Sequence, residues 1–198
     1  VLIATDSFVK GVYDKIVFCL RKGLNVITTA EEMAYPQAQE PELAKELDRI
    51  AKENGVTVLG TGINPGLMMD LLVIILTGAC IDVDHIKAER VNNLSPFGPV
   101  VMNEQGVGIS VEEFNRRAQE GTLAGHVGFV ESINMIADAL GWKLSKEVEQ
   151  TKEPIVSSVY RKAPHAEVQP GDVAGCKMLG YGYIDGELKI EMVHPQQV

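Results

Sequence analysis

The chain has 198 residues, 45% hydrophobic and 23% charged, which is ordinary for a globular protein large enough to bury a core. Its formal net charge of −9 argues against nucleic acid and against an anionic membrane as partners, because both select basic surfaces. Three widely spaced cysteines without a CxxC pair predict neither a zinc site nor a disulfide framework. These features, with no basic region of the kind that opens a signal peptide, predict a cytoplasmic protein.

The first 80 residues alternate between short apolar stretches and amphipathic helical patterns. Strands are expected at 1–5, 24–29 and 56–60, and helices that each end at a glycine at 8–22 and 41–54. Connections this short predict parallel strands joined by right-handed crossovers. The chain begins inside the first strand and stops just after a late one, so we expect a piece of a longer protein.

The stretch GTGINPGLMMD, from Gly60 to Asp70, connects the third strand to the next helix. A strand, a glycine-rich turn and a helix N-terminus form a geometry that presents backbone N–H groups to a ligand. The following helix, expected over Leu67–Leu76, is almost wholly apolar, which predicts that it is buried. Asp70 interrupts this helix and is expected to be paired or to face a cavity, because an unpaired buried charge is costly.

From residue 81 onward the pattern changes. A charged strand is expected over 82–93, and Ser110 precedes a helix as its cap, with Glu113 three residues on. A further helix runs to Leu140, and strands fill the rest of the chain, with Asp185-Gly186 suited to a two-residue hairpin turn. The sequence therefore predicts an α/β domain over 1–80, half of a parallel sheet, and an α+β domain with an antiparallel sheet over 81–198.

Small polar residues follow all three strands of the predicted parallel sheet. The carboxyl ends of parallel strands share one edge, where a dinucleotide fold holds its nicotinamide. The sequence has no GxGxxG motif before a helix, so in such a fold the phosphate loop would precede Val1. The alternative is plain turn chemistry, and Asn64 in particular suits a helix N-cap. The residues expected on the cofactor side are Thr5, Ser7, Thr29, Glu31, Asn64 and Pro65.

His126 is the candidate catalytic residue. A histidine that opens a helix has its pKa lowered by the helix dipole, so the neutral imidazole can act as a general base. A histidine satisfied at a helix start is the alternative. Arg90 is suited to clamp a carboxylate, with surface placement as its alternative. Glu131 is expected to be a solvated surface acid, and the remaining histidines show no metal-ligand spacing.

Five segments together resemble the family of 2,4-diaminopentanoate dehydrogenases, which is related to the dihydrodipicolinate reductases. They are VLIATDSF, GLNVITTAEEMAYP, GTGINPGLMMD, RVNNLSPFGP and GHVGFVESINMIADALGW. The resemblance implies a Rossmann domain followed by an α+β substrate and oligomerisation domain, in a homodimer or homotetramer. It also implies NAD- or NADP-dependent oxidative deamination of 2,4-diaminopentanoate to 2-amino-4-oxopentanoate, a step of ornithine degradation.

One departure from the related reductases bears on the substrate. Dihydrodipicolinate reductases carry a histidine pair and a lysine loop where this chain has the segment from Arg90 to Gly98, with neither residue type. That difference argues against dihydrodipicolinate and favours an amino acid held by Arg90, Asn92, Asn93 and Ser95. Two alternatives are a different diamino acid as substrate, and a non-catalytic fragment that self-associates and does not bind NAD(P) tightly.

Overall fold

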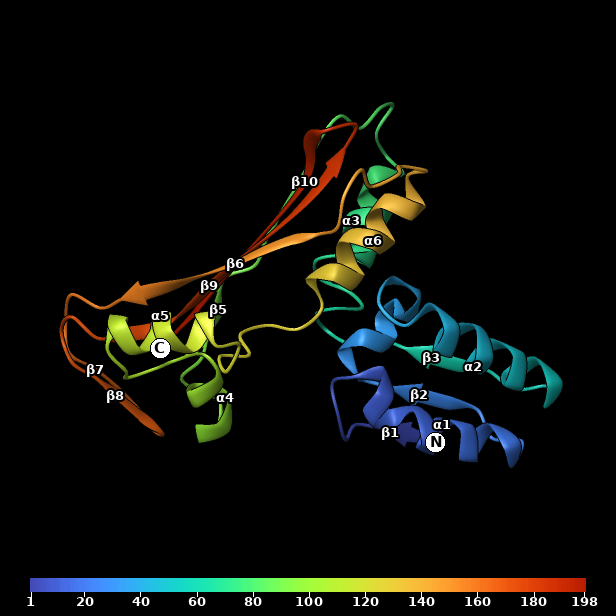
Figure 1. Ribbon diagram of the computed structural model, residues 1–198, viewed down its shortest axis with the longest axis horizontal. Helices are drawn as coiled ribbons and strands as arrows, with labels where there is room; N and C mark the ends of the chain where they lie inside the picture. Colours follow the sequence, from blue (N-terminus) through green and yellow to red (C-terminus); the bar gives the residue numbers. More distant parts are fainter. The chain divides into compact units, whose positions relative to one another are not determined.

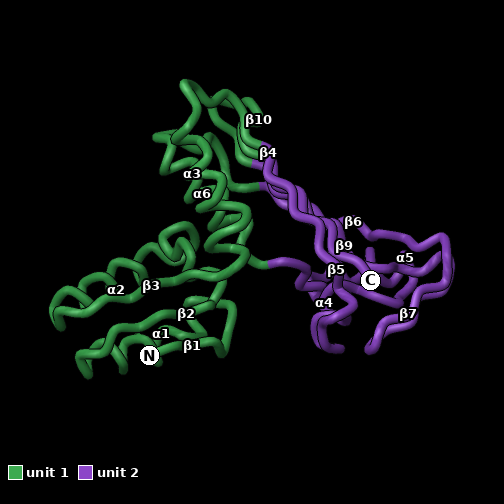
Figure 2. The backbone as a smooth tube through the Cα atoms, turned by 180° about the vertical axis from the view of Figure 1, so that it is seen from behind, with its two compact units in different colours: residues 1–86, 127–148, 182–190 green, residues 87–126, 149–181, 191–198 purple.

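The computed structural model describes all 198 residues, Val1 to Val198. The contacts within the chain form two compact units, drawn in different colours in Figure 2, and each is described by itself. The first unit contains residues 1–86, 127–148 and 182–190, and the second contains residues 87–126, 149–181 and 191–198. The chain therefore contributes several separate segments to each unit.

A three-stranded parallel sheet forms the base of the first unit. Its strands are β1 (Leu2–Ile3), β2 (Val26–Thr28) and β3 (Val58–Gly60), in that spatial order (Figure 1). The crossovers are α1 (Val9–Arg21) and α2 (Pro41–Glu53), with the short 3₁₀ turns η1 (Glu31–Ala34) and η2 (Pro36–Ala38) between β2 and α2. The predicted parallel sheet is confirmed, although each strand is shorter than the apolar pattern suggested.

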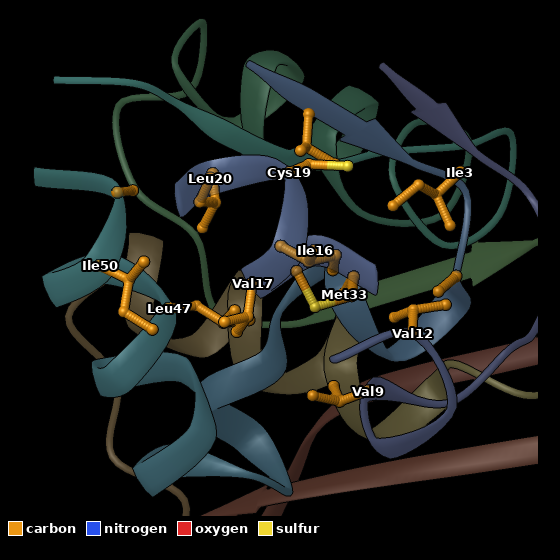
Figure 3. Packing of buried hydrophobic residues seen from close by; sticks show 13 residues of the cluster. Ile3, Val9, Val12, Ile16, Val17, Cys19, Leu20, Met33, Leu47 and Ile50 are labelled. Atoms are coloured by element: carbon orange, nitrogen blue, oxygen red, sulfur yellow. The ribbon is translucent and has the colours of Figure 1, made fainter. Parts of the chain in front are cut away.

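The core of this unit lies on one face of the parallel sheet (Figure 3). Successive strand residues point to opposite faces, so Ile3 is buried against α1 and α2. The neighbouring positions Leu2, Ile27 and Leu59 pair in register across the three strands and are 69%, 45% and 51% exposed. The second face of the sheet thus carries an exposed apolar row.

Gly60 marks the close passage of η1 over the end of β3. A Cβ atom at this position would lie 1.7 Å from the carbonyl oxygen of Met33, a distance no side chain allows. Gly60, the first glycine of the GTGINPG segment, is therefore required by packing against η1 rather than by a positive φ.

Helix α3 (Leu71–Thr77) begins later than the apolar pattern predicts, and the expectation that it is buried is wrong. Asp70 caps the helix by accepting the N–H of Leu71 at 2.6 Å, so the acid precedes the helix instead of interrupting it. The exposed fractions of its residues lie between 38% and 61% at Leu71, Leu72, Ile75 and Leu76. One side of α3 contacts α6 (Phe129–Ala139). No helix here has the length and apolar character that crossing a membrane requires.

The longest strands form a second, mainly antiparallel sheet. Its members are β4 (Ile86–Glu89), β5 (Asn92–Asn93), β6 (Glu149–Val156), β9 (Val173–Ile184) and β10 (Glu187–Gln197). The order is β4-β10-β9-β6, and β5 pairs in parallel with β10. The Asp185-Gly186 turn between β9 and β10 has φ values of 51° and 83°, which confirms the predicted hairpin.

The remaining elements belong to the second unit. They are α4 (Pro99–Glu104), α5 (Val111–Gln119) and the antiparallel pair β7 (Arg161–Ala163) and β8 (Ala166–Val168). Ser110 caps α5 as predicted, since its hydroxyl oxygen accepts the N–H of Glu113 at 3.2 Å. A parallel α/β portion followed by a mainly antiparallel α+β portion confirms the predicted fold class.

Candidate functional site

Arg90, His126 and His194 come from distant parts of the sequence and meet in the second unit. The N–H of Arg90, just after β4, donates to the carbonyl of Val193 in β10 at 3.0 Å. This pairing places Arg90 beside His194, which is 104 residues away in the sequence. The rings of His126 and His194 meet edge to face, with their centroids 5.1 Å apart. No pattern in the sequence indicates a role for His194, and the structure adds it to the candidate site.

The contacts of His194 fix which ring nitrogen carries the proton. Nδ1 lies 2.7 Å from the carbonyl oxygen of Arg90, and a carbonyl can only accept, so Nδ1 is the donor. In the neutral ring, Nε2 is then the acceptor, and it lies 3.5 Å from Nη1 of Arg90. Arg90 is thus held by His194 through both its backbone and its side chain.

Both histidine rings are neutral at ordinary pH. Burial lowers the pKa of His194 to about 4, and the charge of Arg90 acts in the same direction. Burial also lowers the pKa of His126 to about 3, with further contributions from His194 and Arg90. The neutral state of His126 was predicted, but the reason was wrong. Helix α6 begins at Phe129, so His126 lies before the helix and burial replaces the helix dipole as the cause.

Arg90 is a cation without an acidic partner. Its guanidinium is half-buried, burial lowers its pKa, and no carboxylate lies within ion-pair distance. A partly desolvated guanidinium beside two neutral rings can bind a carboxylate, because Arg presents a planar fork of donors. The predicted carboxylate role of Arg90 fits this geometry.

The three polar residues after Arg90 separate into two groups. Asn92 in β5 is half-buried, and its Nδ2 donates to Oε1 of Gln196 at 3.2 Å. Gln196 lies two positions beyond His194 on β10, so the two point to the same face of the sheet. Asn93 instead accepts the N–H of Ser95 at 2.9 Å in a local turn and is exposed. Asn92 is therefore the member of this group closest in register to the histidine.

The six residues expected on the cofactor side all follow the carboxyl ends of β1, β2 or β3 in the first unit. Thr5 accepts a hydrogen bond from Nζ of Lys15 at 2.8 Å, and the carbonyl of Ser7 accepts the N–H of Glu32 at 3.1 Å. Asn64 does not cap a helix, which corrects one alternative, because the cap of α3 is Asp70. Asn64 precedes Pro65 through a cis peptide bond, and its Nδ2 lies 3.5 Å from Sδ of Met69.

Asp70 holds the third of these strand-end loops. Its carboxylate is fully buried and accepts from the N–H of Gly66 at 2.7 Å, from the hydroxyl of Ser132 at 2.8 Å and from the N–H of Leu71 at 2.6 Å. The expectation that Asp70 is paired is confirmed. These three donors join the loop after β3 to α3 and to the first turn of α6.

Glu131 overturns an expectation. The sequence predicted a solvated surface acid, yet the side chain of Glu131 is fully buried. Its Oε1 accepts from Nε2 of Gln39 at 2.6 Å, and burial raises its pKa. The polar partner comes from the segment after η2, which helix periodicity around Glu131 does not reveal.

Acid is expected to destabilise the protein through the buried histidines. The pKa of His194 is about 4 in the folded state and near 6.5 in an exposed ring, so the unfolded state binds the proton first as the pH falls. The contribution of neutral His194 to the free energy of unfolding is therefore fully present above about pH 6.5 and declines toward pH 4. Replacing His194 with glutamine should lower the free energy of unfolding at both pH values. The loss should be about 1–2 kcal/mol smaller at pH 5 than at pH 7. Denaturant titrations of both proteins at the two pH values measure this. An equal difference at both would contradict it.

Comparison with known proteins shows the family. The family model described as the 2,4-diaminopentanoate dehydrogenase C-terminal domain matches residues 67–198. The chain belongs to this family. It is 68% identical over all 198 residues to 2,4-diaminopentanoate dehydrogenase of Acetoanaerobium sticklandii, and it spans 56% of that protein.

A solved structure supports the same fold. An amine dehydrogenase from Mycobacterium smegmatis matches all of this chain with a TM-score of 0.80 and 25% identity, over 58% of its own length. The part of the chain matched by the 2,4-diaminopentanoate dehydrogenase model contains Arg90, Asn92, His126 and His194. The cofactor-side candidates lie before it, within the range matched by the Acetoanaerobium sticklandii enzyme.

Proposed function

We propose that the protein to which this chain belongs catalyses NAD(P)-dependent oxidative deamination of 2,4-diaminopentanoate to 2-amino-4-oxopentanoate. The relative from Acetoanaerobium sticklandii carries the name of this enzyme, and the matching structure from Mycobacterium smegmatis is an amine dehydrogenase. The observation in this chain that carries the proposal is Arg90, a half-buried guanidinium without a carboxylate partner, next to two neutral histidines.

In this proposal Arg90 binds the carboxylate of the amino acid. Because His126 and His194 are uncharged, Arg90 supplies the single positive charge of the cluster, which matches the single negative charge of the ligand. His194 orients the guanidinium, and the side-chain amide of Asn92 on the adjacent strand β5 offers the substrate a hydrogen-bond donor and an acceptor. Asn93 and Ser95 belong to the neighbouring turn and are the two further residues proposed to bind the substrate.

The strand-end loops fit the nicotinamide half of NAD or NADP. A Cβ atom at Gly62 would lie 2.9 Å from the carbonyl oxygen of Pro65, so the backbone turns tightly at the end of β3. The residues proposed to hold the cofactor are Thr5, Ser7, Thr29, Glu31, Asn64 and Pro65. When bound, the nicotinamide would accept the hydride.

The chemistry at the substrate follows from the groups that surround it. The ammonium group on the reacting carbon loses a proton, a hydride leaves that carbon, and water adds to the iminium carbon. Loss of ammonium then leaves the ketone. We assign His126 to the proton transfer as base or proton shuttle, because a neutral imidazole can accept a proton and burial lowers the pKa of this ring to about 3.

Replacing His126 with alanine should lower turnover of the full-length enzyme at least tenfold, since positioned acid–base groups typically contribute about 10²–10⁴. His126→Asn is the matched variant, because asparagine keeps a hydrogen-bonding side chain that does not accept a proton at neutral pH. Steady-state rates should fall similarly in both variants. Unchanged turnover in His126→Ala would remove this residue from the mechanism, and full activity in His126→Asn would leave it only an orienting role.

We extend the proposal to the oligomeric state, the partners and the location of the enzyme. We expect a homodimer or homotetramer that associates through the mainly antiparallel sheet, as implied by the resemblance to related dehydrogenases. The net charge of −9 supports a small-molecule substrate rather than nucleic acid or a membrane. The reduced cysteines expected from their spacing support a cytoplasmic location. We also propose that the chain divides near residue 80 into two domains, 1–80 and 81–198.

A substrate panel tests the assignment. The full-length enzyme is assayed with 2,4-diaminopentanoate, with other diamino acids and with simple amino acids, in the presence of NAD or NADP. The proposal expects the highest kcat/KM for 2,4-diaminopentanoate. A higher value for another diamino acid would keep the chemistry and change the substrate, whereas reaction with none of them would contradict the proposal.

A further inference from the structure

The first turn of α6 carries two adjacent buried polar residues, Glu131 and Ser132, which contact the strand-end loops or the segments that hold them. Ser132 donates to Asp70, which holds the loop after β3. Glu131, which is fully buried, accepts from Nε2 of Gln39 at 2.6 Å. The mechanism proposed above uses neither residue.

The contact of Glu131 continues to the other two loops. Nε2 of Gln39 also lies 3.5 Å from Oε1 of Glu32 in η1. Glu32 in turn makes two bonds to the segment after β1. Its Oε2 accepts the N–H of Val9 at 2.7 Å, and its own N–H donates to the carbonyl of Ser7 at 3.1 Å. The sequence of contacts from Glu131 through Gln39 to Glu32 therefore reaches the loops that follow β1 and β2.

We propose that Glu131 is a positioning residue that, through Gln39 and Glu32, fixes the strand-end loops at Thr5–Ser7 and Thr29–Glu31 for cofactor binding. This inference rests on the proposed function, because it takes those loops as the cofactor side. Glu131 does not touch the reacting atoms. Its effect is on the geometry of backbone groups that Glu32 holds.

The surroundings of the Glu131 carboxyl group show which of its oxygens makes the contact. Oε2 of Glu131 has no hydrogen-bond partner, and the carboxylate of Glu32 is the charged group that faces it from η1. Burial and this neighbouring carboxylate raise the pKa of Glu131, while the hydrogen bond from Gln39 acts in the opposite direction. A glutamine at this position keeps the carbonyl oxygen that accepts from Gln39, whereas an alanine removes it. The contact, rather than the charge, is what the loops require.

The test uses the full-length enzyme with Glu131→Ala, Glu131→Gln and the control Glu112→Ala, an exposed acid in the first turn of α5. We expect Glu131→Ala to raise KM for NAD(P) about tenfold with kcat changed less than about twofold, and Glu131→Gln to restore the wild-type value. Glu112→Ala should change neither constant. Equal KM in the wild type and Glu131→Ala would overturn the proposal, as would a defect in Glu131→Gln as large as that in Glu131→Ala.

Hydrogen exchange supplies a readout that does not depend on catalysis. The amide of Val9 is in the first turn of α1, where helical bonds do not protect it, and its acceptor is Glu32. Exchange of this amide should speed up in Glu131→Ala and remain unchanged in Glu131→Gln. If Glu131→Ala does not fold, Gln39→Leu breaks the same sequence of contacts at an exposed residue and should speed exchange likewise. Unchanged exchange in that variant would contradict the proposal.

The two readouts separate this inference from the proposed function. A wild-type enzyme that neither binds nor reduces NAD(P) would refute the function, while the exchange of the Val9 amide would still decide whether Glu131 holds the loops. Normal catalysis with exchange unaffected by Glu131→Ala would instead refute only the positioning role.

Discussion

Replacing Arg90 with alanine in the full-length enzyme is expected to lower kcat/KM for 2,4-diaminopentanoate by about 10²- to 10³-fold. This corresponds to about 3–4 kcal/mol, the range observed when one partner of a partly buried, hydrogen-bonded charge pair is removed. In the proposed binding mode the substrate carboxylate pairs with the guanidinium of the wild-type enzyme. In the variant it meets two histidines without a permanent charge, and burial, the largest cause of both pKa shifts, still lowers the pKa of each ring.

The control for this prediction is a substrate that lacks the carboxylate. For an amine of similar size, Arg90→Ala should change kcat/KM much less than for the amino acid, because no charge is left unpaired. Arg49→Ala, which removes an exposed arginine paired with Glu46 and Glu53 on α2, should leave both values near wild type. An equal loss for both substrates in Arg90→Ala would show that Arg90 supports the structure rather than binding the carboxylate.

Replacing Asp70 with alanine should lower the free energy of unfolding by about 3–5 kcal/mol. The carboxylate is fully buried and accepts three hydrogen bonds, from the N–H groups of Gly66 and Leu71 and from the hydroxyl of Ser132. Without it, three donors lose their acceptor, α3 loses its cap, and a cavity remains. Denaturant unfolding of the full-length protein measures the change.

The matched control for Asp70 is Asp48→Ala, which removes an exposed acid that pairs with Lys52 on α2. Surface pairs of this kind contribute little, so this variant should stay within about 0.5 kcal/mol of the wild type. A loss below about 1 kcal/mol in Asp70→Ala would mean that water replaces the carboxylate at all three donors. That outcome would contradict the role of Asp70 as the joint between the third strand-end loop and α6.

Local signals in the sequence predicted much of the first unit. Gly23 and Gly55 lie just after α1 and α2 with φ values of +70° and +63°, where glycine ends a helix at little cost. The hairpin turn at Asp185-Gly186 likewise depends on two residues that adopt positive φ values. Such features depend on a few consecutive residues, so a single sequence is enough to find them.

Long-range pairing explains what the sequence did not reveal. His194 joins the site because β10 lies beside β4, which brings together residues 104 positions apart, and no local pattern records that pairing. Glu131 is buried because Gln39 supplies a polar partner from another segment. The apolar composition of α3 suggested burial, but composition does not say whether a neighbour covers the helix, and α3 packs on α6 by one side.

The most direct test of the central claim measures two products of one reaction. Purified full-length enzyme is incubated with 2,4-diaminopentanoate and NAD or NADP, and both reduced cofactor and released ammonium are followed. The proposed oxidative deamination predicts that the two form in equal amounts and that neither forms without the amino acid. Reduced cofactor without ammonium would indicate oxidation at another group, and the absence of both would contradict the proposed activity.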